Sequence, residues 1–254
     1  MAKCLLALDA GHGIHTVGRR ISKEFDPEQH REWWLNDRVG RYLQERAAAY
    51  EGFTVLRVDD TTGEEDVRLA ERCQRANEAK ADFFLSLHHN GGIGGGTGGG
   101  LVAFSYPNST KGAEWRDALY DAVLAAGKLR GNRATPKATA NFAVLRQTNM
   151  PAVLIEHGFM DSSTDAPVIL SEVYARACGY AEADCIAQRF GLQKKQPDTP
   201  AAPAGSEPSA FAKEAAQWAI GRGLFVGDEK GDYLWQQPVT REQLAVILQK
   251  FEAK

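Results

Sequence analysis

The sequence predicts an α/β fold with a mostly parallel, twisted sheet and helices on both of its faces. Two observations support this prediction. Before residue 193, short apolar runs alternate with longer amphipathic segments, which is the strand–helix–strand order of a parallel sheet. The short runs are apolar at nearly every position, which is typical of strands that are buried on both faces.

Six short apolar runs are expected to form the strands. The first, Cys4–Leu8, is too short for the apolar region of a signal peptide, has no A-x-A cleavage site, and leads directly into Gly11-His12-Gly13. We therefore interpret it as a buried strand, and we expect a protein made in the cytoplasm without an export signal. The other expected strands are Phe53–Val58, Asp82–Leu87, Leu101–Ser105, Ala143–Leu145 and Ala152–Ile155.

Four amphipathic segments are expected to form the helices. In the second, residues Val67 to Asn77 place their apolar side chains at helical rather than alternating spacing. The four segments are Arg31–Tyr50, Glu64–Lys80, Gly112–Leu129 and Ala166–Phe190.

A proline-rich stretch predicts the domain boundaries. Residues 193–209 hold four prolines among Ala, Gly and Ser, a composition that forms extended linkers rather than a core. We expect a large domain at 1–192, big enough to be a catalytic domain, the linker at 193–209 and a small helical module at 210–254.

Composition and charge exclude several classes of protein. The chain has 30 Lys and Arg against 33 Asp and Glu, so no basic excess is available for nucleic acid. No apolar run approaches the roughly 18 residues of a membrane span, so no membrane partner is expected. The four cysteines lie far apart, which argues against a disulfide scaffold or a zinc finger.

Three motifs stand where predicted strands end. They are Asp9-Ala10-Gly11-His12-Gly13, Ser86-Leu87-His88-His89-Asn90 and Ile155-Glu156-His157-Gly158-Phe159. Active sites of parallel α/β sheets form at the carboxyl ends of strands, so we expect these motifs to converge. Two histidines and a carboxylate are the usual ligands of a catalytic zinc ion, which keeps one position for water.

In these motifs the chain resembles the type-3 family of zinc-dependent N-acetylmuramoyl-L-alanine amidases, over about residues 3–190. The resemblance implies an α/β fold related to the zinc exopeptidases. It also implies cleavage of peptidoglycan between N-acetylmuramic acid and the L-alanine of the stem peptide, with Zn²⁺ as cofactor.

The resemblance implies His, Glu and His as the zinc ligands. His12 and His88 take the histidine positions, and Glu24, Glu28 and Glu32 are candidates for the carboxylate. The family's Glu opens a helix and is followed four residues later by Asn, a pattern that only Glu32 fits. Alternatively, Glu32 binds no metal and is acidic only because a negative charge stabilises the N-terminus of a helix.

Glu156 is implied as the catalytic acid and base, because a carboxylate beside the zinc can take a proton from water and return it to the leaving nitrogen. Asn90 and Arg146 are expected to bind substrate, although a solvated surface position is the favoured alternative for Arg146. His89 departs from the family pattern and is expected to line the rim or to shape the pocket. The glycine-rich segment 91–100 is interpreted as a mobile rim or as a plain connector.

The segment 210–254 resembles one S-layer homology repeat, in which Thr240 and Gln243 would form a capping box. Such repeats bind secondary cell-wall polymers, and a single repeat also suggests a homo-oligomer. The sequence thus predicts a peptidoglycan amidase of the phage-endolysin type that acts on the bacterial wall after release. A zinc peptidase of the stem peptide and an inactive wall-binding protein are the alternatives.

Overall fold

The computed structural model describes residues 2–195, 208–225, 235, 239 and 241–252. The chain divides into two compact units, 1–195 and 196–254. The first unit holds a six-stranded sheet with the order β2-β1-β3-β6-β4-β5. Its strands are β1 (Cys4–Ala10), β2 (Phe53–Arg57), β3 (Phe83–Asn90), β4 (Val102–Ser105), β5 (Lys137–Thr139) and β6 (Ala152–Phe159). Strands β2, β1, β3 and β6 are parallel, and β4 runs antiparallel to β6.

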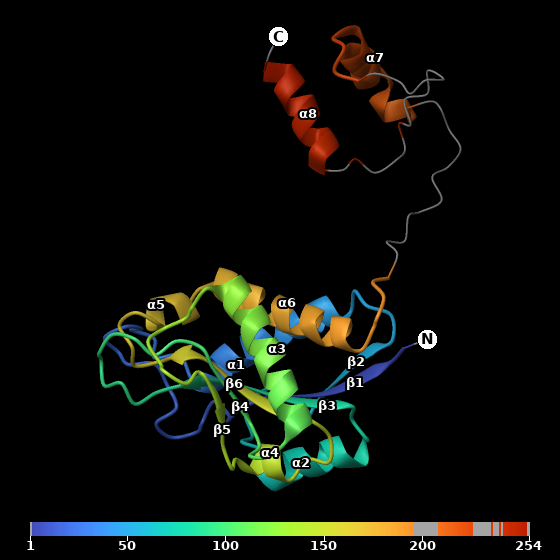
Figure 1. Cartoon of the computed structure of the whole chain (residues 1–254). Helices are drawn as coiled ribbons and strands as arrows, with labels where there is room; N and C mark the ends of the chain where they lie inside the picture. Colours follow the sequence, from blue (N-terminus) through green and yellow to red (C-terminus); the bar gives the residue numbers. More distant parts are fainter. Residues whose placement is uncertain (1, 196–207, 226–234, 236–238, 240, 253–254) are drawn as a thin grey trace. The chain divides into compact units, whose positions relative to one another are not determined.

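Helices cover both faces of this sheet (Figure 1). Helices α1 (Glu32–Ala47), α3 (Thr110–Gly127) and α6 (Glu172–Arg189) lie on one face, and α2 (Leu69–Glu78) and α4 (Ala143–Arg146) lie on the other. The mostly parallel α/β fold predicted from the sequence is confirmed. No helix among the described residues is long and apolar enough to cross a membrane.

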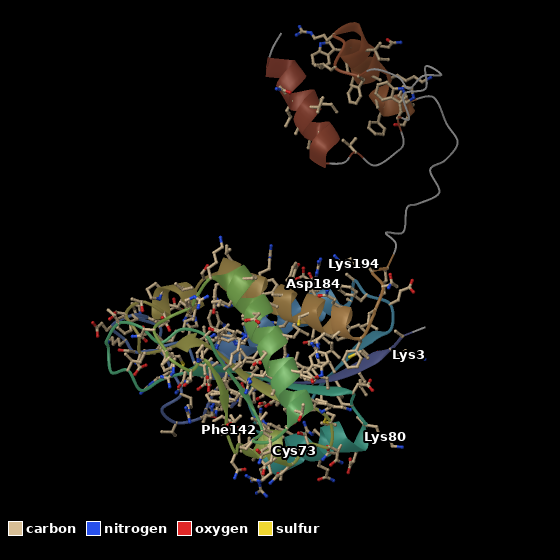
Figure 2. All side chains as sticks on the ribbon, viewed as in Figure 1. Lys3, Cys73, Lys80, Phe142, Asp184 and Lys194 are labelled. Atoms are coloured by element: carbon tan, nitrogen blue, oxygen red, sulfur yellow. The ribbon has the colours of Figure 1, made fainter. Side chains whose placement is uncertain are left out.

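Alternation along the strands builds a separate core under each helical layer. Leu6, Leu8, Leu85 and Leu87 pack against α1, α3 and α6, whereas the intervening residues, such as Ala7, face α2 and α4. The second core is the smaller one, and there Cys73 of α2 lies 3.9 Å from the carbonyl oxygen of Ala143. Figure 2 shows Cys73 and Phe142 together on that side of the sheet.

The prediction of a strand at Ala143–Leu145 is wrong. These residues form the short helix α4, in which the amides of Leu145 and Arg146 both donate to the carbonyl of Phe142. Three apolar residues show no period, so their pattern cannot separate a strand from one buried helical turn. The sixth strand is instead β5, a short edge strand that the sequence analysis did not identify.

Helix boundaries also differ from prediction. The expected helix at 166–190 is divided into α5 (Ala166–Ile169) and α6, because Ser171 has extended backbone dihedrals between them. Helix α2 begins only at Leu69, and the residues from Glu64 to Arg68 form a loop beside the strand ends.

The second unit contains a short 3-10 helix at Ala210–Ala212, α7 (Lys213–Gly221) and α8 (Arg241–Glu252). Most of the predicted linker and the predicted cap Thr240 lie outside the described residues.

Residues 193–195, predicted as the start of the linker, are bonded to the first unit. The amide of Glu51 donates to Gln193, and the amide of Lys195 donates to Ala49. Leu192, just before them, is 7% exposed and belongs to the core.

We therefore expect a chain that ends at Lys195 to fold independently, and a chain that ends at Phe190 to be less stable. The shorter chain loses the burial of Leu192 and these backbone hydrogen bonds, about 3 kcal/mol in the free energy of unfolding. Urea unfolding of both chains measures the difference, and equal midpoints would show that residues 191–195 contribute nothing.

Candidate functional site

The three motifs meet at the carboxyl ends of β1, β3 and β6. His12 follows β1 in a left-handed backbone conformation (φ 69°), His88 lies near the end of β3, and Glu156 lies opposite His88 on β6. Glu32, the first residue of α1, completes the group. One ligand atom from each of His12, Glu32 and His88 lies within 4.8 Å of the others, so this cluster could hold a metal ion.

Glu32 is the centre of the cluster. Its side chain is 1% exposed, with Oε1 2.9 Å from His88 Nδ1 and Oε2 3.4 Å from His12 Nε2. Oε1 also accepts a hydrogen bond from the backbone amide of His89. Burial alone would raise the pKa of Glu32, but the two imidazoles outweigh it and hold that pKa well below its usual range. Glu32 is therefore an anion in a buried site.

The other carboxylate candidates lie elsewhere. Glu28 is exposed and lies 3.3 Å from His30, and Glu24 is exposed as well. The position four residues after Glu32 is Asn36, whose side chain donates to the carbonyl of Gly11 and so links α1 to the loop that carries His12. The structure therefore places Glu32, and neither alternative, between the two histidines.

Glu156 lies beside the cluster with a different environment. Its Oε2 atom is buried and has no hydrogen-bond partner among the described residues. Burial raises the pKa of Glu156 to about 7, although the nearby His88 opposes the rise. A carboxyl group with a pKa near neutrality can both take and return a proton at physiological pH, as a general base and acid must.

Arg72 supports the loop that carries His12. The guanidinium is 1% exposed, pairs with the buried Asp9, and donates to the carbonyl oxygens of Ala10 and His12. Asp9 in turn accepts the hydroxyl of Ser86 on the neighbouring strand. This ion pair fixes the backbone on both sides of Gly11. The sequence analysis missed it, although an arginine on a helix otherwise spaced for burial was a visible signal.

The other predicted residues lie outside the cluster. Asn90 accepts the amide of Gly91 with its side-chain oxygen, and Arg146 is exposed on α4, where it donates to Asn141. His89 is 1% exposed and does not lie on a rim, and its Nδ1 is 2.8 Å from Asn36 Oδ1. Burial, together with the charge of His157, holds the pKa of His89 well below its usual value. The substrate-binding roles of Asn90 and Arg146 stay predictions.

Two aspartates that the sequence analysis missed anchor the glycine-rich segment 91–100. Asp161 accepts the amides of Gly92 and Gly94, and Asp165 accepts the amide of Gly100. Both aspartates follow the third motif in the run Met160-Asp161-Ser162-Ser163-Thr164-Asp165. The segment is therefore tied to the residues that follow β6.

A pocket of about 300 Å³ opens beside the cluster, on the side of α2. His12 and His88 line it together with the loop that precedes α2. Its complete lining is Asp9, Gly11, His12, Asp66, Val67, Arg68, Leu69, Arg72 and His88.

The family model described as N-acetylmuramoyl-L-alanine amidase matches residues 6–188 of the chain, which include every residue of the cluster. The chain belongs to this family. Its members named below are similar to the chain in sequence or in fold.

Three of the sequence relatives come from Bacillus species and a Bacillus phage. The N-acetylmuramoyl-L-alanine amidase CwlM of Bacillus licheniformis is 37% identical over 134 residues, 52% of this chain and 50% of the relative. A sporulation-specific amidase of Bacillus subtilis is 34% identical over 57% of this chain and 54% of its own length. The endolysin of Bacillus phage SPP1 is 30% identical over 66% of this chain and 58% of its own length. The chain thus spans about half the length of the curated relatives it matches.

Solved structures of the amidase family share the fold. An N-acetylmuramoyl-L-alanine amidase from Clostridium difficile 630 has a TM-score of 0.66 at 23% identity, over 75% of this chain and 98% of its own. The catalytic domain of CwlV from Bacillus (Paenibacillus) polymyxa has a TM-score of 0.65 at 20% identity, over 75% of this chain and 99% of its own.

Replacing Arg72 by Met is expected to lower the free energy of unfolding by about 3–5 kcal/mol, because Asp9 would remain buried without a positively charged partner. Arg68→Ala is the matched control, since Arg68 precedes the same helix, is exposed, and has no ion pair within the described part of the chain. It should change stability by less than about 0.5 kcal/mol. Chemical unfolding measures both, and a small effect of Arg72→Met would remove the buried pair from the account.

Proposed function

We propose that the chain hydrolyses the amide bond between N-acetylmuramic acid and the L-alanine of the peptidoglycan stem, with one zinc ion held by His12, Glu32 and His88. One observation carries the proposal: the cluster of His12, Glu32 and His88 lies beside Glu156, a carboxyl group whose pKa is about 7. Membership of the amidase family and the names of the relatives support the choice of bond.

The donor set fits zinc. Two imidazoles and one carboxylate form a common catalytic zinc site. Glu32 Oε2 is buried and makes no hydrogen bond among the described residues, although His12 Nε2 lies 3.4 Å and Arg19 lies 3.8 Å away, so a bound cation would complete its environment. A bound zinc ion supplies a Lewis acid that polarises a carbonyl group and lowers the pKa of water.

The residues of the chain then divide the remaining work. Glu156 accepts a proton from the attacking water at its free Oε2 atom, and the amide C–N bond breaks after the water oxygen has bonded to the carbonyl carbon. The same carboxyl group returns the proton to the nitrogen of L-alanine, so one residue balances the protons of the reaction. The pocket beside His12 and His88 gives room for the groups that flank the bond.

We propose a wall-directed role for the second unit, in keeping with the resemblance of 210–254 to an S-layer homology repeat. Helix α7 and helix α8 carry exposed aromatic side chains, of which Trp218 and Phe251 lie with ring centroids 6.3 Å apart. Such a surface can bind a secondary cell-wall polymer or a second copy of the chain. The proposed place of action is the bacterial cell wall after release, as in a phage endolysin.

Digestion of purified Gram-positive walls tests the reaction. The protein should release new N-terminal alanine and no new sugar reducing ends, because only the lactyl–alanine amide is cut. Glu156→Gln should bind zinc normally but act about two to four orders of magnitude more slowly, since an amide cannot take the proton. New N-termini within the stem peptide would favour a peptidase, and near-normal turnover of Glu156→Gln would contradict the role of Glu156.

Metal analysis tests the ligand set. His88→Ala and Glu32→Gln should each lose most bound zinc together with activity, because each removes one of three protein ligands. Glu28→Gln is the control, since Glu28 lies on the exposed loop before α1 and should leave zinc content unchanged. Full zinc occupancy in His88→Ala, or loss of zinc in Glu28→Gln, would overturn the assignment.

A further inference from the structure

A β-bulge lies within the candidate metal site. The regular register of β3 and β6 is lost between His88 and Asn90, and two residues of β6, His157 and Gly158, lie opposite the single residue His89. Gly158 has a φ of 136°, a conformation that side chains disfavour. Bulges redirect side chains near active sites. Because this bulge interrupts the regular pairing of the strands beside His88, other interactions must stabilise it.

The side chain of His157 bridges the bulge. Its Nδ1 atom is 3.2 Å from the carbonyl oxygen of His88, and its Nε2 atom is 3.0 Å from Glu182 Oε1 on α6. Both side chains are fully buried. Because a carbonyl oxygen only accepts, Nδ1 must be the donor, and Glu182 fixes the other end of the ring. The hydroxyl of Tyr174 donates to the carbonyl oxygen of His157 itself and holds its backbone.

One peptide group connects this pair to the metal cluster. The carbonyl of the peptide unit between His88 and His89 accepts from His157, and the amide of the same unit donates to Glu32 Oε1 over 3.2 Å. A peptide group whose carbonyl accepts a hydrogen bond is a stronger amide donor, so the two bonds support each other. Glu182, His157 and the peptide group thus form one hydrogen-bonded chain that ends on Glu32.

We propose that the buried His157–Glu182 pair positions the zinc ligands Glu32 and His88 through this peptide group. The inference rests on the proposed zinc site. Stability alone is a poor reason for the pair, because a buried pair of polar groups is often no more stabilising than apolar residues of the same size. The pair has a function if it holds the backbone of His88 and, through the peptide group, the carboxylate of Glu32.

Two double variants separate positioning from stability. His157→Leu with Glu182→Met removes the pair and the donor to His88. His157→Asn with Glu182→Met removes the same pair, but the asparagine amide lies close to the former Nδ1 position and restores the donor. Zinc affinity, measured by competition with a chelator in the full chain, should fall about 10–100-fold in the first variant. The second variant should recover most of the affinity.

Asp184→Asn is a control on the same helix. Asp184 accepts hydrogen bonds from Arg46 and Tyr50 and lies toward the end of α6 from which the chain leaves the first unit (Figure 2). Loss of the Asp184 charge should lower the midpoint temperature of unfolding and leave the zinc affinity unchanged. Equal zinc affinities of the two double variants would overturn the positioning role. Absence of zinc binding by the unmodified protein would contradict the proposed function, and this inference with it.

A measurement on the unmodified protein applies if both double variants fail to fold. Nitrogen-15 chemical shifts of the His157 ring should show a protonated Nδ1, and the amide of His89 should exchange slowly with solvent. An unprotonated Nδ1 would overturn the inference, because the ring could not then donate to His88.

Discussion

A buried carboxylate is the constraint on which the candidate site depends. Glu32 is almost completely shielded from water, and an unpaired anion in that position would cost several kcal/mol. The chain offsets this cost with two imidazoles and one backbone amide, which come from the ends of β1 and β3. Since these groups lie in two separate segments, the loop after β1 and the end of β3, the start of α1 and the strand ends must be held in register for the site to exist.

The rest of the first unit provides that register through buried polar groups. Arg72 and Asp9 hold the loop of His12, Asn36 links the same loop to α1, and the glycine-rich segment is bound to Asp165. Each of these groups is buried and paired, so each costs little when the structure is complete and much when one partner is removed. Apolar packing on the two faces builds the sheet, and the polar groups at its edge determine where the reactive side chains lie.

Local patterns predicted the sheet and most of the cluster. His12, His88 and Glu156 were found because each follows an apolar run, and Glu32 because Asn36 lies four residues after it in a family pattern. Patterns of this kind report which residues share an element. They failed at Ala143–Leu145, where three apolar residues carry no period.

Partners that are distant in sequence were not predictable in this way. Glu182 lies 25 residues after His157 and on another element, so only the packing of α6 on the sheet brings the two together. Asp161 and Asp165 bind glycine amides some 65 to 69 residues earlier in the chain. The bulge opposite His89 has no sequence signal beyond Gly158, because it is a property of two paired strands rather than of one.

The central claim is that two imidazoles and one carboxylate of this chain bind a zinc ion. X-ray absorption spectroscopy of the zinc-loaded protein tests it most directly, because the spectrum separates nitrogen and oxygen ligands from sulfur and reveals imidazole rings by their multiple scattering. The account predicts only nitrogen and oxygen neighbours at about 2.0–2.2 Å, with the scattering signature of two imidazole rings. A sulfur neighbour near 2.3 Å, or a first shell with fewer than two imidazoles, would contradict it.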